Sequence, residues 1–92
     1  MSLKTADVDR VFRKLRMETR DAKDKHAWFV YEGRRLLHSM RSHGKGDIPG
    51  RVGQFIRQQL RVNEQQFAGL RDCTVTYDQY VQILRDRGVI PS

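Results

Sequence analysis

The sequence predicts a small α+β domain, in which a small antiparallel sheet has helices on one face and is followed by two short C-terminal helices. Three observations lead to this prediction. A chain of 92 residues has room for one modest hydrophobic core. Two apolar runs flank a glycine-containing turn, which is typical of a β-hairpin. Segments with apolar residues at helical spacing lie on both sides of that hairpin.

The N-terminal segment predicts a helix that ends near Leu15. Its apolar residues repeat at helical spacing and form one stripe: Val8, Val11, Phe12 and Leu15. Ser2 or Thr5 can cap the start, and acidic residues in the first turn suit the helix dipole. A short edge strand is expected over residues 17–20, and a loop over 21–25.

The hairpin is expected between the runs 26–31 and 36–40, with Glu32-Gly33 or Gly33-Arg34 as its two-residue turn. In both registers, directly opposed residues share a face. The expected core face carries Ala27, Phe29, Tyr31, Leu36, His38 and Met40. The expected open face carries His26, Trp28, Val30, Leu37, Ser39 and Arg41. With Gly33-Arg34 as the turn His26 would lie opposite Arg41, whereas a three-residue turn would swap these faces.

After the hairpin, a small polar loop leads to Pro49, which suits the first turn of a helix because its missing N–H costs nothing there. This helix is expected to end near Arg61 and to point four residues inward: Val52, Phe55, Ile56 and Leu60. The same start signal then occurs at 62–67 and at 75–80, with a capping residue and a glutamine three positions later. It predicts helices over Glu64–Arg71 and 77–87, the second ending at Gly88.

The charge is strongly positive and unevenly distributed. The net charge is +7, and residues 1–61 carry fifteen Lys and Arg against seven Asp and Glu, whereas residues 62–92 carry three against four. This distribution favours a polyanionic ligand, with a solvated basic surface as the alternative. Nucleic acid is favoured over a membrane, since no segment combines a basic face with a strongly apolar one. The single Cys73 excludes an internal disulfide, and a cytoplasmic location is the default expectation.

Histidines among cations are the pattern that suggests chemistry. His26, His38 and His43 lack the spacing of metal ligands, and the expected registers put His26 and His38 on opposite faces, so neither a metal site nor a cofactor is expected. A neutral imidazole can take the 2′-hydroxyl proton of RNA or protonate the leaving oxygen, and nearby Lys or Arg stabilise the charge on phosphate. The alternatives are that a strand histidine is structural and that Trp28 belongs to the core.

A family resemblance rests on two segments. Asp24-Lys25-His26, followed by Trp28-Phe29-Val30-Tyr31, stands where a Gly-Ser-His motif opens the second strand of the HicA toxin family, with Asp24-Lys25 in place of Gly-Ser. The segment 47–52 resembles the family's entry to its last helix. Over about residues 8–62, the chain therefore resembles the HicA toxins, which are small mRNA interferases with an α-β-β-β-α fold similar to the double-stranded-RNA-binding domain.

The resemblance implies an endoribonuclease toxin of a bacterial type II toxin–antitoxin pair, with His26 as general base or acid. His43, in the exposed loop, is the second catalytic candidate. The expected RNA-binding residues are basic or aromatic: Lys23, Lys25, Trp28, Arg34, Arg41 and Lys45. Residues 1–62 would form the RNA-binding and catalytic domain, and residues 63–92 a helical extension packed on the same domain.

Partners and alternative functions follow from the same reading. RNA and an acidic antitoxin protein are the expected partners, and residues 63–92 offer a homodimer contact. One alternative is a non-catalytic RNA-binding module of the same fold. Another is a DNA-binding or assembly protein that uses the C-terminal helices, although the net charge of −1 beyond Arg61 argues against DNA.

Overall fold

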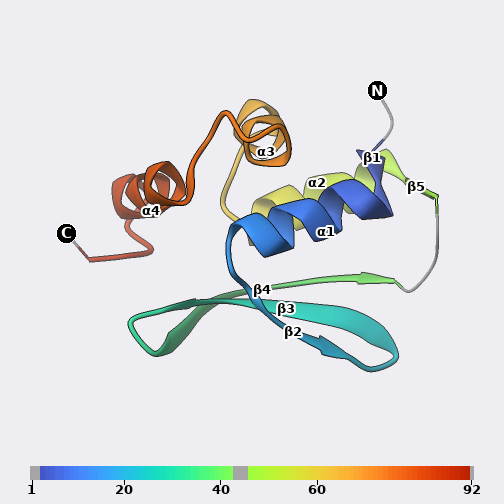
Figure 1. Cartoon of the computed structure of the whole chain (residues 1–92), viewed down its shortest axis with the longest axis horizontal. Helices are drawn as coiled ribbons and strands as arrows, with labels where there is room; N and C mark the ends of the chain where they lie inside the picture. Colours follow the sequence, from blue (N-terminus) through green and yellow to red (C-terminus); the bar gives the residue numbers. More distant parts are fainter. Residues whose placement is uncertain (1–2, 43–45, 92) are drawn as a thin grey trace.

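The computed structural model describes residues 3–42 and 46–91, which contain both helices and strands (Figure 1). Their order is β1 (Leu3–Lys4), α1 (Thr5–Lys14), β2 (Glu18–Asp21), β3 (Asp24–Tyr31), β4 (Arg34–Ser42), β5 (Asp47–Ile48), α2 (Gly50–Gln59), α3 (Glu64–Arg71) and α4 (Tyr77–Asp86). The predicted α+β class is confirmed. No helix in this described part of the chain is long and apolar enough to cross a membrane.

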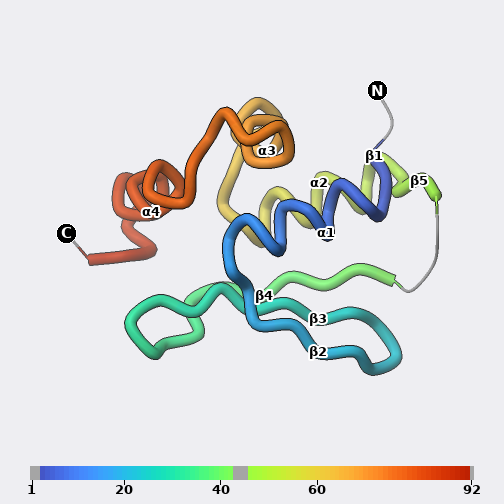
Figure 2. Tube along the Cα trace, viewed as in Figure 1, coloured from blue at the N-terminus to red at the C-terminus, as the bar shows by residue number. Residues whose placement is uncertain are grey.

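The main sheet is antiparallel throughout and has the strand order β2-β3-β4. Helices α1 and α2 lie on the same side of this sheet (Figures 1 and 2). The predicted arrangement, with helices on one face and the other face open, is therefore confirmed. When only the strands of the main sheet are counted, the elements from α1 to α2 run helix, three strands, helix, and the two-residue strand β5 lies between β4 and α2.

The hairpin turn between β3 and β4 is Glu32-Gly33. Tyr31 pairs with Arg34, so two residues connect the strands. Glu32 and Gly33 have φ angles of 51° and 77°, and positive values at both positions are those of a type I′ turn. This was one of the two turns that the sequence allowed.

A bulge next to this turn changes the register of the hairpin. Val30 pairs with Arg35, whereas Phe29 pairs with Leu37, so Leu36 is an extra residue on β4. Leu37 is buried, and Leu36 packs against the core from a partly buried position. The bulge thus allows two consecutive leucines to contact the core.

The extra residue makes the predicted faces of β4 wrong, because a shift of one residue moves the following side chains to the other face. The core face of β4 carries Leu37, Ser39 and Arg41. The open face carries His38 and Met40, and His26 lies opposite Met40. On β3 the predicted faces are right at Ala27 and Phe29, which are fully buried.

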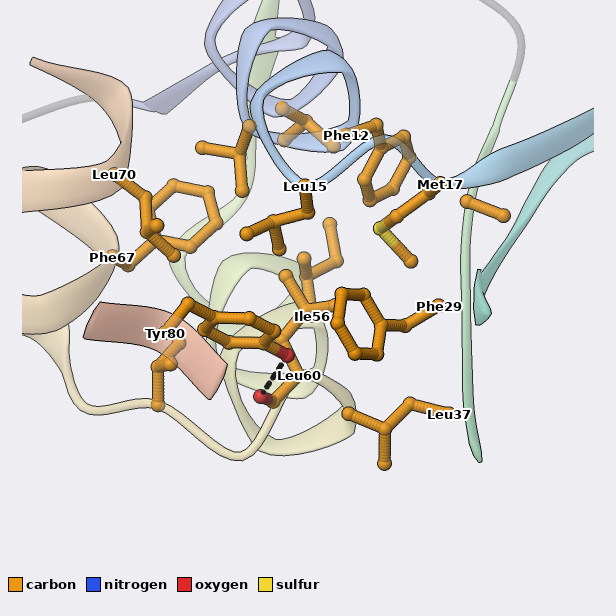
Figure 3. Packing of buried hydrophobic residues seen from close by; sticks show 14 of the residues in the cluster. Phe12, Leu15, Met17, Phe29, Leu37, Ile56, Leu60, Phe67, Leu70 and Tyr80 are labelled. Atoms are coloured by element: carbon orange, nitrogen blue, oxygen red, sulfur yellow. Dashed lines mark hydrogen bonds between the residues drawn. The ribbon is translucent and has the colours of Figure 1, made fainter. Parts of the chain in front are cut away.

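The hydrophobic core lies between the sheet and the helices (Figure 3). All four helices and the main sheet contribute large buried side chains: Phe12, Leu15, Phe29, Leu37, Ile56, Leu60, Phe67, Leu70 and Tyr80. The Tyr80 hydroxyl donates a hydrogen bond to the Leu60 carbonyl oxygen at 2.8 Å. The two C-terminal helices therefore share one core with α1, α2 and the sheet.

Helix α2 buries only part of its predicted inward face. Ile56 and Leu60 are buried as predicted, whereas Val52 is 36% exposed and Phe55 is 57% exposed. The inward face is set by Gly53, Ile56 and Leu60, which follow one another at spacings of three and four residues. Val52 and Phe55 each precede an inward residue by one position, which rotates them by about 100° toward solvent.

Both predicted capping boxes are confirmed. The Asn63 side chain accepts a hydrogen bond from the Gln66 N–H at 2.7 Å, and the Gln66 side-chain oxygen accepts one from the Asn63 N–H at 2.9 Å. Thr76 and Gln79 make the same reciprocal pair at 3.1 Å and 2.8 Å. These bonds satisfy N–H groups that a helix start leaves without partners.

A two-residue ladder that the sequence did not predict joins the start of the chain to the segment before α2. Leu3 pairs with Ile48 and Lys4 with Asp47, and the Lys4 ammonium lies 3.1 Å from the Asp47 carboxylate. Thr5 is the first residue of α1 rather than its cap. The other predicted cap, Ser2, lies outside the described residues.

Candidate functional site on the open face of the sheet

The open face of the sheet brings two histidines and the tryptophan together. Trp28 is flanked by Glu18 of β2 on one side and by His38 of β4 on the other. His26 precedes Trp28 by two residues, so it points to the same face. We refer to His26, Trp28 and His38 as the open-face cluster.

Direct contact holds the cluster together. Nδ1 of His26 lies 2.9 Å from Nε2 of His38, which is a hydrogen-bonding distance, and the two ring planes differ by 19°. The ring centroid of Trp28 is 5.9 Å from that of His26 and 5.3 Å from that of His38. The three rings therefore form one continuous aromatic surface.

The hydrogen bond between the histidines constrains their protonation. A neutral imidazole has one N–H donor and one acceptor nitrogen. If His26 Nδ1 donates, Nε2 of His26 is a base and Nδ1 of His38 carries the proton. If His38 Nε2 donates, Nδ1 of His38 is the base and Nε2 of His26 carries the proton. In both tautomers, the neutral pair presents one proton acceptor and one proton donor at its two remaining nitrogens.

The surroundings favour the neutral form of His38. Its partial burial, and to a smaller extent the charge of His26, lower the pKa of His38 below the ordinary histidine value. At neutral pH the His38 ring is therefore mostly uncharged, and it can either donate or accept the hydrogen bond with His26.

Two arginines place positive charge beside the cluster. The guanidinium of Arg35 lies over the Trp28 ring, 4.4 Å from its centroid, in a cation–π contact. The same guanidinium forms an ion pair with Glu18 across the sheet. Arg20 of β2 is directly opposite His26 in the register and therefore faces the same side.

Besides Leu37, two polar residues predicted for the open face lie on the core face instead. Arg41 donates to both carboxylate oxygens of Asp9 on α1, at 2.7 Å and 2.9 Å, and its side chain is 11% exposed. Ser39 is fully buried and donates to the Gln59 side chain at 2.8 Å. Both follow from the register shift on β4. The predicted phosphate-binding role of Arg41 would require breaking this ion pair.

Lys25 lies at the same end of the core face. Its ammonium is 3.4 Å from the Asp9 carboxylate, so Asp9 is shared between Lys25 and Arg41. Burial raises the pKa of Asp9, but the hydrogen bonds and charges of Arg41 and Lys25 outweigh this effect and hold the pKa below the ordinary aspartate value. The three residues connect α1 to the sheet.

The remaining predicted site residues are spread along the hairpin. Lys23 is exposed in the turn between β2 and β3. Arg34 is the first residue of β4 and pairs with Tyr31 at the far end of β3, about 23 Å from the start of that strand at the usual strand rise. It lines a cavity of about 420 Å³ with Tyr31 and Arg85. His43 and Lys45 lie outside the described residues. Of the predicted site residues, Trp28 and His26 are therefore in contact, whereas Arg34 lies apart from them at the hairpin turn.

Sequence reasoning missed the pairing of His38 with His26 and the positions of Arg20 and Arg35. The sequence shows that His26 and Trp28 share one face of their strand and that His38 and Met40 share one face of theirs. It does not show the bulge at Leu36, which puts both pairs on the same face of the sheet.

Among the described residues, no group of three or more histidine, cysteine or acidic side chains could hold a metal ion. Comparisons with protein-family models, curated proteins and solved structures find no match to this chain.

Proposed function

We propose that this chain binds RNA on the open face of the sheet and cleaves it there as an endoribonuclease, like the HicA mRNA interferases that it resembles. The observation that carries the proposal is the 2.9 Å contact between His26 and His38 beside an accessible tryptophan. The net charge of +7 supports a polyanionic substrate. The helix–three strands–helix order is compatible with a fold similar to the double-stranded-RNA-binding domain.

The cluster offers a stacking surface for an unpaired base. RNA-binding sheets commonly stack bases on aromatic side chains, and Trp28 lies at the centre of this face, where a base would replace the Arg35 guanidinium that lies over its ring. Arg20 and Arg35 would neutralise the adjoining phosphates, since a guanidinium can make two parallel hydrogen bonds to phosphate. Arg35 would exchange its exposed ion pair with Glu18 for a phosphate, which is a small loss.

The histidine pair would catalyse transfer of the phosphoryl group within the RNA. The acceptor nitrogen of the pair takes the 2′-hydroxyl proton, and the oxygen attacks the adjacent phosphorus. The bond to the 5′-oxygen of the next nucleotide breaks, and the donor nitrogen of the pair protonates that oxygen. The products are a 2′,3′-cyclic phosphate and a 5′-hydroxyl.

The proton between the rings completes the cycle. The pair has gained a proton at one end and lost one at the other, so transfer of the shared proton across the 2.9 Å hydrogen bond leaves both rings neutral. The result is the other tautomer of the same pair. One pair of side chains would thus supply both the base and the acid of the reaction.

The biological setting implied by the resemblance is a toxin–antitoxin pair. The toxin would be held inactive by an acidic partner that covers the basic residues of the open face. Residues 63–91 bury their largest apolar side chains within the chain itself, including Phe67, Leu70 and Tyr80. The predicted homodimer contact through this region would therefore use polar surface.

The test is cleavage of a single-stranded RNA by purified protein, with His26→Ala, His38→Ala and His43→Ala compared. We expect each of the first two substitutions to lower the cleavage rate by roughly 10²–10⁴-fold, whereas His43→Ala is the matched control and cleaves normally. Trp28→Ala should weaken RNA binding by about tenfold or more. The product should end in a 2′,3′-cyclic phosphate.

Three outcomes would change the proposal. Full cleavage by His38→Ala would exclude the paired mechanism, and loss in His43→Ala alone would move the site to the loop after β4. Absence of cleavage, combined with salt-dependent RNA binding that Trp28→Ala weakens, would leave a non-catalytic RNA-binding module.

A further inference from the structure

A groove with apolar walls lies at the edge of the sheet, apart from the open-face cluster. It runs between the C-terminal half of β4 and helix α2 and has a volume of about 230 Å³. Met40 and Ser42 line it from β4, and Val52, Phe55 and Gln59 line it from α2. We call it the edge groove.

The strand that borders this groove is the last strand of the sheet. Within the described residues β4 pairs with β3 alone, so the outer edge of its nine residues has no strand partner. From residue 37 to residue 42 its register with β3 is continuous, which leaves that half of the edge regular. An unpaired regular edge is a template for another strand, and β4 contains no proline that would prevent pairing.

The exposed apolar side chains of the described chain gather at the same place. Val52 and Phe55 are the large hydrophobic residues that remain exposed, at 36% and 57%. Phe55 also borders a second, smaller hollow with Arg51 and Gln58, so solvent reaches the ring from two sides. Neighbouring exposed apolar residues of this kind mark interaction sites on otherwise polar surfaces.

The positive charge around the groove favours an acidic partner. Helix α2 and strand β4 contain no aspartate or glutamate, and they carry five arginines: Arg34, Arg35, Arg41, Arg51 and Arg57. Two of the five are already paired, Arg41 with Asp9 and Arg35 with Glu18. A second copy of the chain would bring like charges together, which disfavours self-pairing. An acidic partner would be attracted.

We propose that the edge groove binds an extended acidic segment of a partner protein as a fourth strand beside β4. The backbone of the segment would pair with the free edge, and its alternate side chains would point to opposite faces. Apolar side chains on one face would cover Phe55 and Val52, and acidic side chains on the other would meet Arg35. RNA lacks the peptide groups that pair with a strand edge. The inference is independent of the proposed ribonuclease activity.

The test uses a library of random linear peptides displayed on phage and selected against the full-length chain. The selected peptides should be acidic, with apolar residues at alternate positions. A synthetic copy of the dominant peptide should bind Phe55→Ser about tenfold or more weakly than the wild type. On binding, amide hydrogen exchange should slow within residues 37–42. Because Phe55 is exposed, Phe55→Ser should keep its fold, which an amide NMR spectrum checks.

Two controls separate this site from the open face. Trp28→Ala should bind the peptide as the wild type does, and Phe55→Ser should retain the RNA binding and cleavage of the wild type. Selected peptides without net negative charge, or equal affinity for Phe55→Ser, would overturn the inference. Displacement of the peptide from Trp28→Ala, whose open face binds RNA weakly, by an oligouridylate would assign the groove to RNA. A wild-type dimer that Phe55→Ser dissociates would assign it to a second copy.

Discussion

The contact between His26 and His38 depends on the number of protons that the two rings carry. When both rings are protonated, Nδ1 of His26 and Nε2 of His38 each carry a hydrogen, and neither nitrogen can accept the hydrogen bond. Two positive charges then lie at the 2.9 Å contact, with Arg20 and Arg35 on the same face. Of the carboxylates on this face, Glu18 is paired with Arg35, and Asp24 precedes His26 by two residues on β3. Acid should therefore open the cluster.

This contact predicts that stability falls as the pH drops from about 7 to about 5. The pKa of His38 in the folded chain is lower than its ordinary value, so the unfolded chain binds more protons in this range. The free energy of unfolding therefore increases as the pH rises through this range and decreases on acidification. His38→Gln should flatten this dependence relative to the wild type, as measured by urea unfolding at pH 5 and pH 7.5. An identical pH dependence in the two proteins would contradict the prediction.

The ion pair between Asp9 and Arg41 predicts a stability loss at a single residue. Asp9→Asn removes the charge that faces Arg41 and Lys25, while Arg41 stays largely buried. The free energy of unfolding should fall by about 2 kcal/mol, which is less than for a fully buried pair because the Asp9 side chain is 28% exposed. Urea unfolding at pH 7 measures this loss.

Asp21→Asn is the matched control for this substitution. Asp21 is exposed on β2, and its side chain makes no hydrogen bond or ion pair with another described residue. Its replacement should change the free energy of unfolding by less than about 0.5 kcal/mol. Equal effects of the two substitutions would show that the loss reflects net charge rather than the ion pair.

At the scale of the elements, all four helices end in the same way. A residue with left-handed backbone follows each of them, with φ angles of 54° at Arg16, 62° at Arg61, 65° at Cys73 and 77° at Gly88. The N–H of the next residue bonds back into the last turn, as Met17 does to the Phe12 carbonyl at 3.0 Å. The sequence predicted the end of α4 from Gly88. The other three helices have arginine or cysteine at this position instead of the usual glycine, so their ends carried no such signal.

These helix ends predict that Cys73→Gly stabilises the protein. Cysteine in the left-handed region carries a steric cost that glycine avoids, and only part of this gain is lost to the greater freedom of the unfolded chain. The free energy of unfolding should increase by about 0.5–1 kcal/mol in thermal or urea unfolding. Gly88→Ala is the reverse control and should destabilise by a similar amount. A lower melting temperature for Cys73→Gly would contradict this account.

The strands show which elements local patterns can predict. The Glu32-Gly33 turn, the period-two pattern of β3 and the capping boxes depend on neighbouring residues, and all of them could be read from the sequence. The bulge at Leu36 depends on contacts of the two leucines with distant helices, so no local signal fixed it. That single residue decided whether His38 or Arg41 joined His26, and hence the composition of the candidate site.

At the scale of the whole molecule, β4 connects two surfaces of different chemistry. Its open face contributes His38 and Arg35 to the cluster, and its free edge borders the groove beneath Phe55. A strand added at the edge would lie next to His38 without covering Trp28, which is in the neighbouring strand. An acidic partner could therefore dock at the edge and place further acidic residues over the cluster.

The shared core predicts that residues 63–92 cannot be removed without unfolding the chain. Tyr80 is fully buried, packs edge-on against Phe29 at 5.2 Å and bonds to the Leu60 carbonyl, and Phe67 and Leu70 fill the space beside α1. A chain that ends at residue 62 would expose the apolar residues that pack against these side chains. A domain of about 60 residues buries too little apolar surface to tolerate that loss. It should show poorly dispersed amide resonances and no cooperative urea transition.

Tyr80→Phe in the full-length chain is the control, because it removes the hydroxyl but keeps the ring. It should remain folded and lose about 1–2 kcal/mol, since the buried Leu60 carbonyl loses its hydrogen bond from Tyr80. A cooperative transition in the truncated chain would show instead that residues 1–62 fold alone. If the truncated chain is unfolded, partner contacts of α3 and α4 have to be tested by exchanging exposed residues such as Gln82, because deletion would abolish the RNA site together with them.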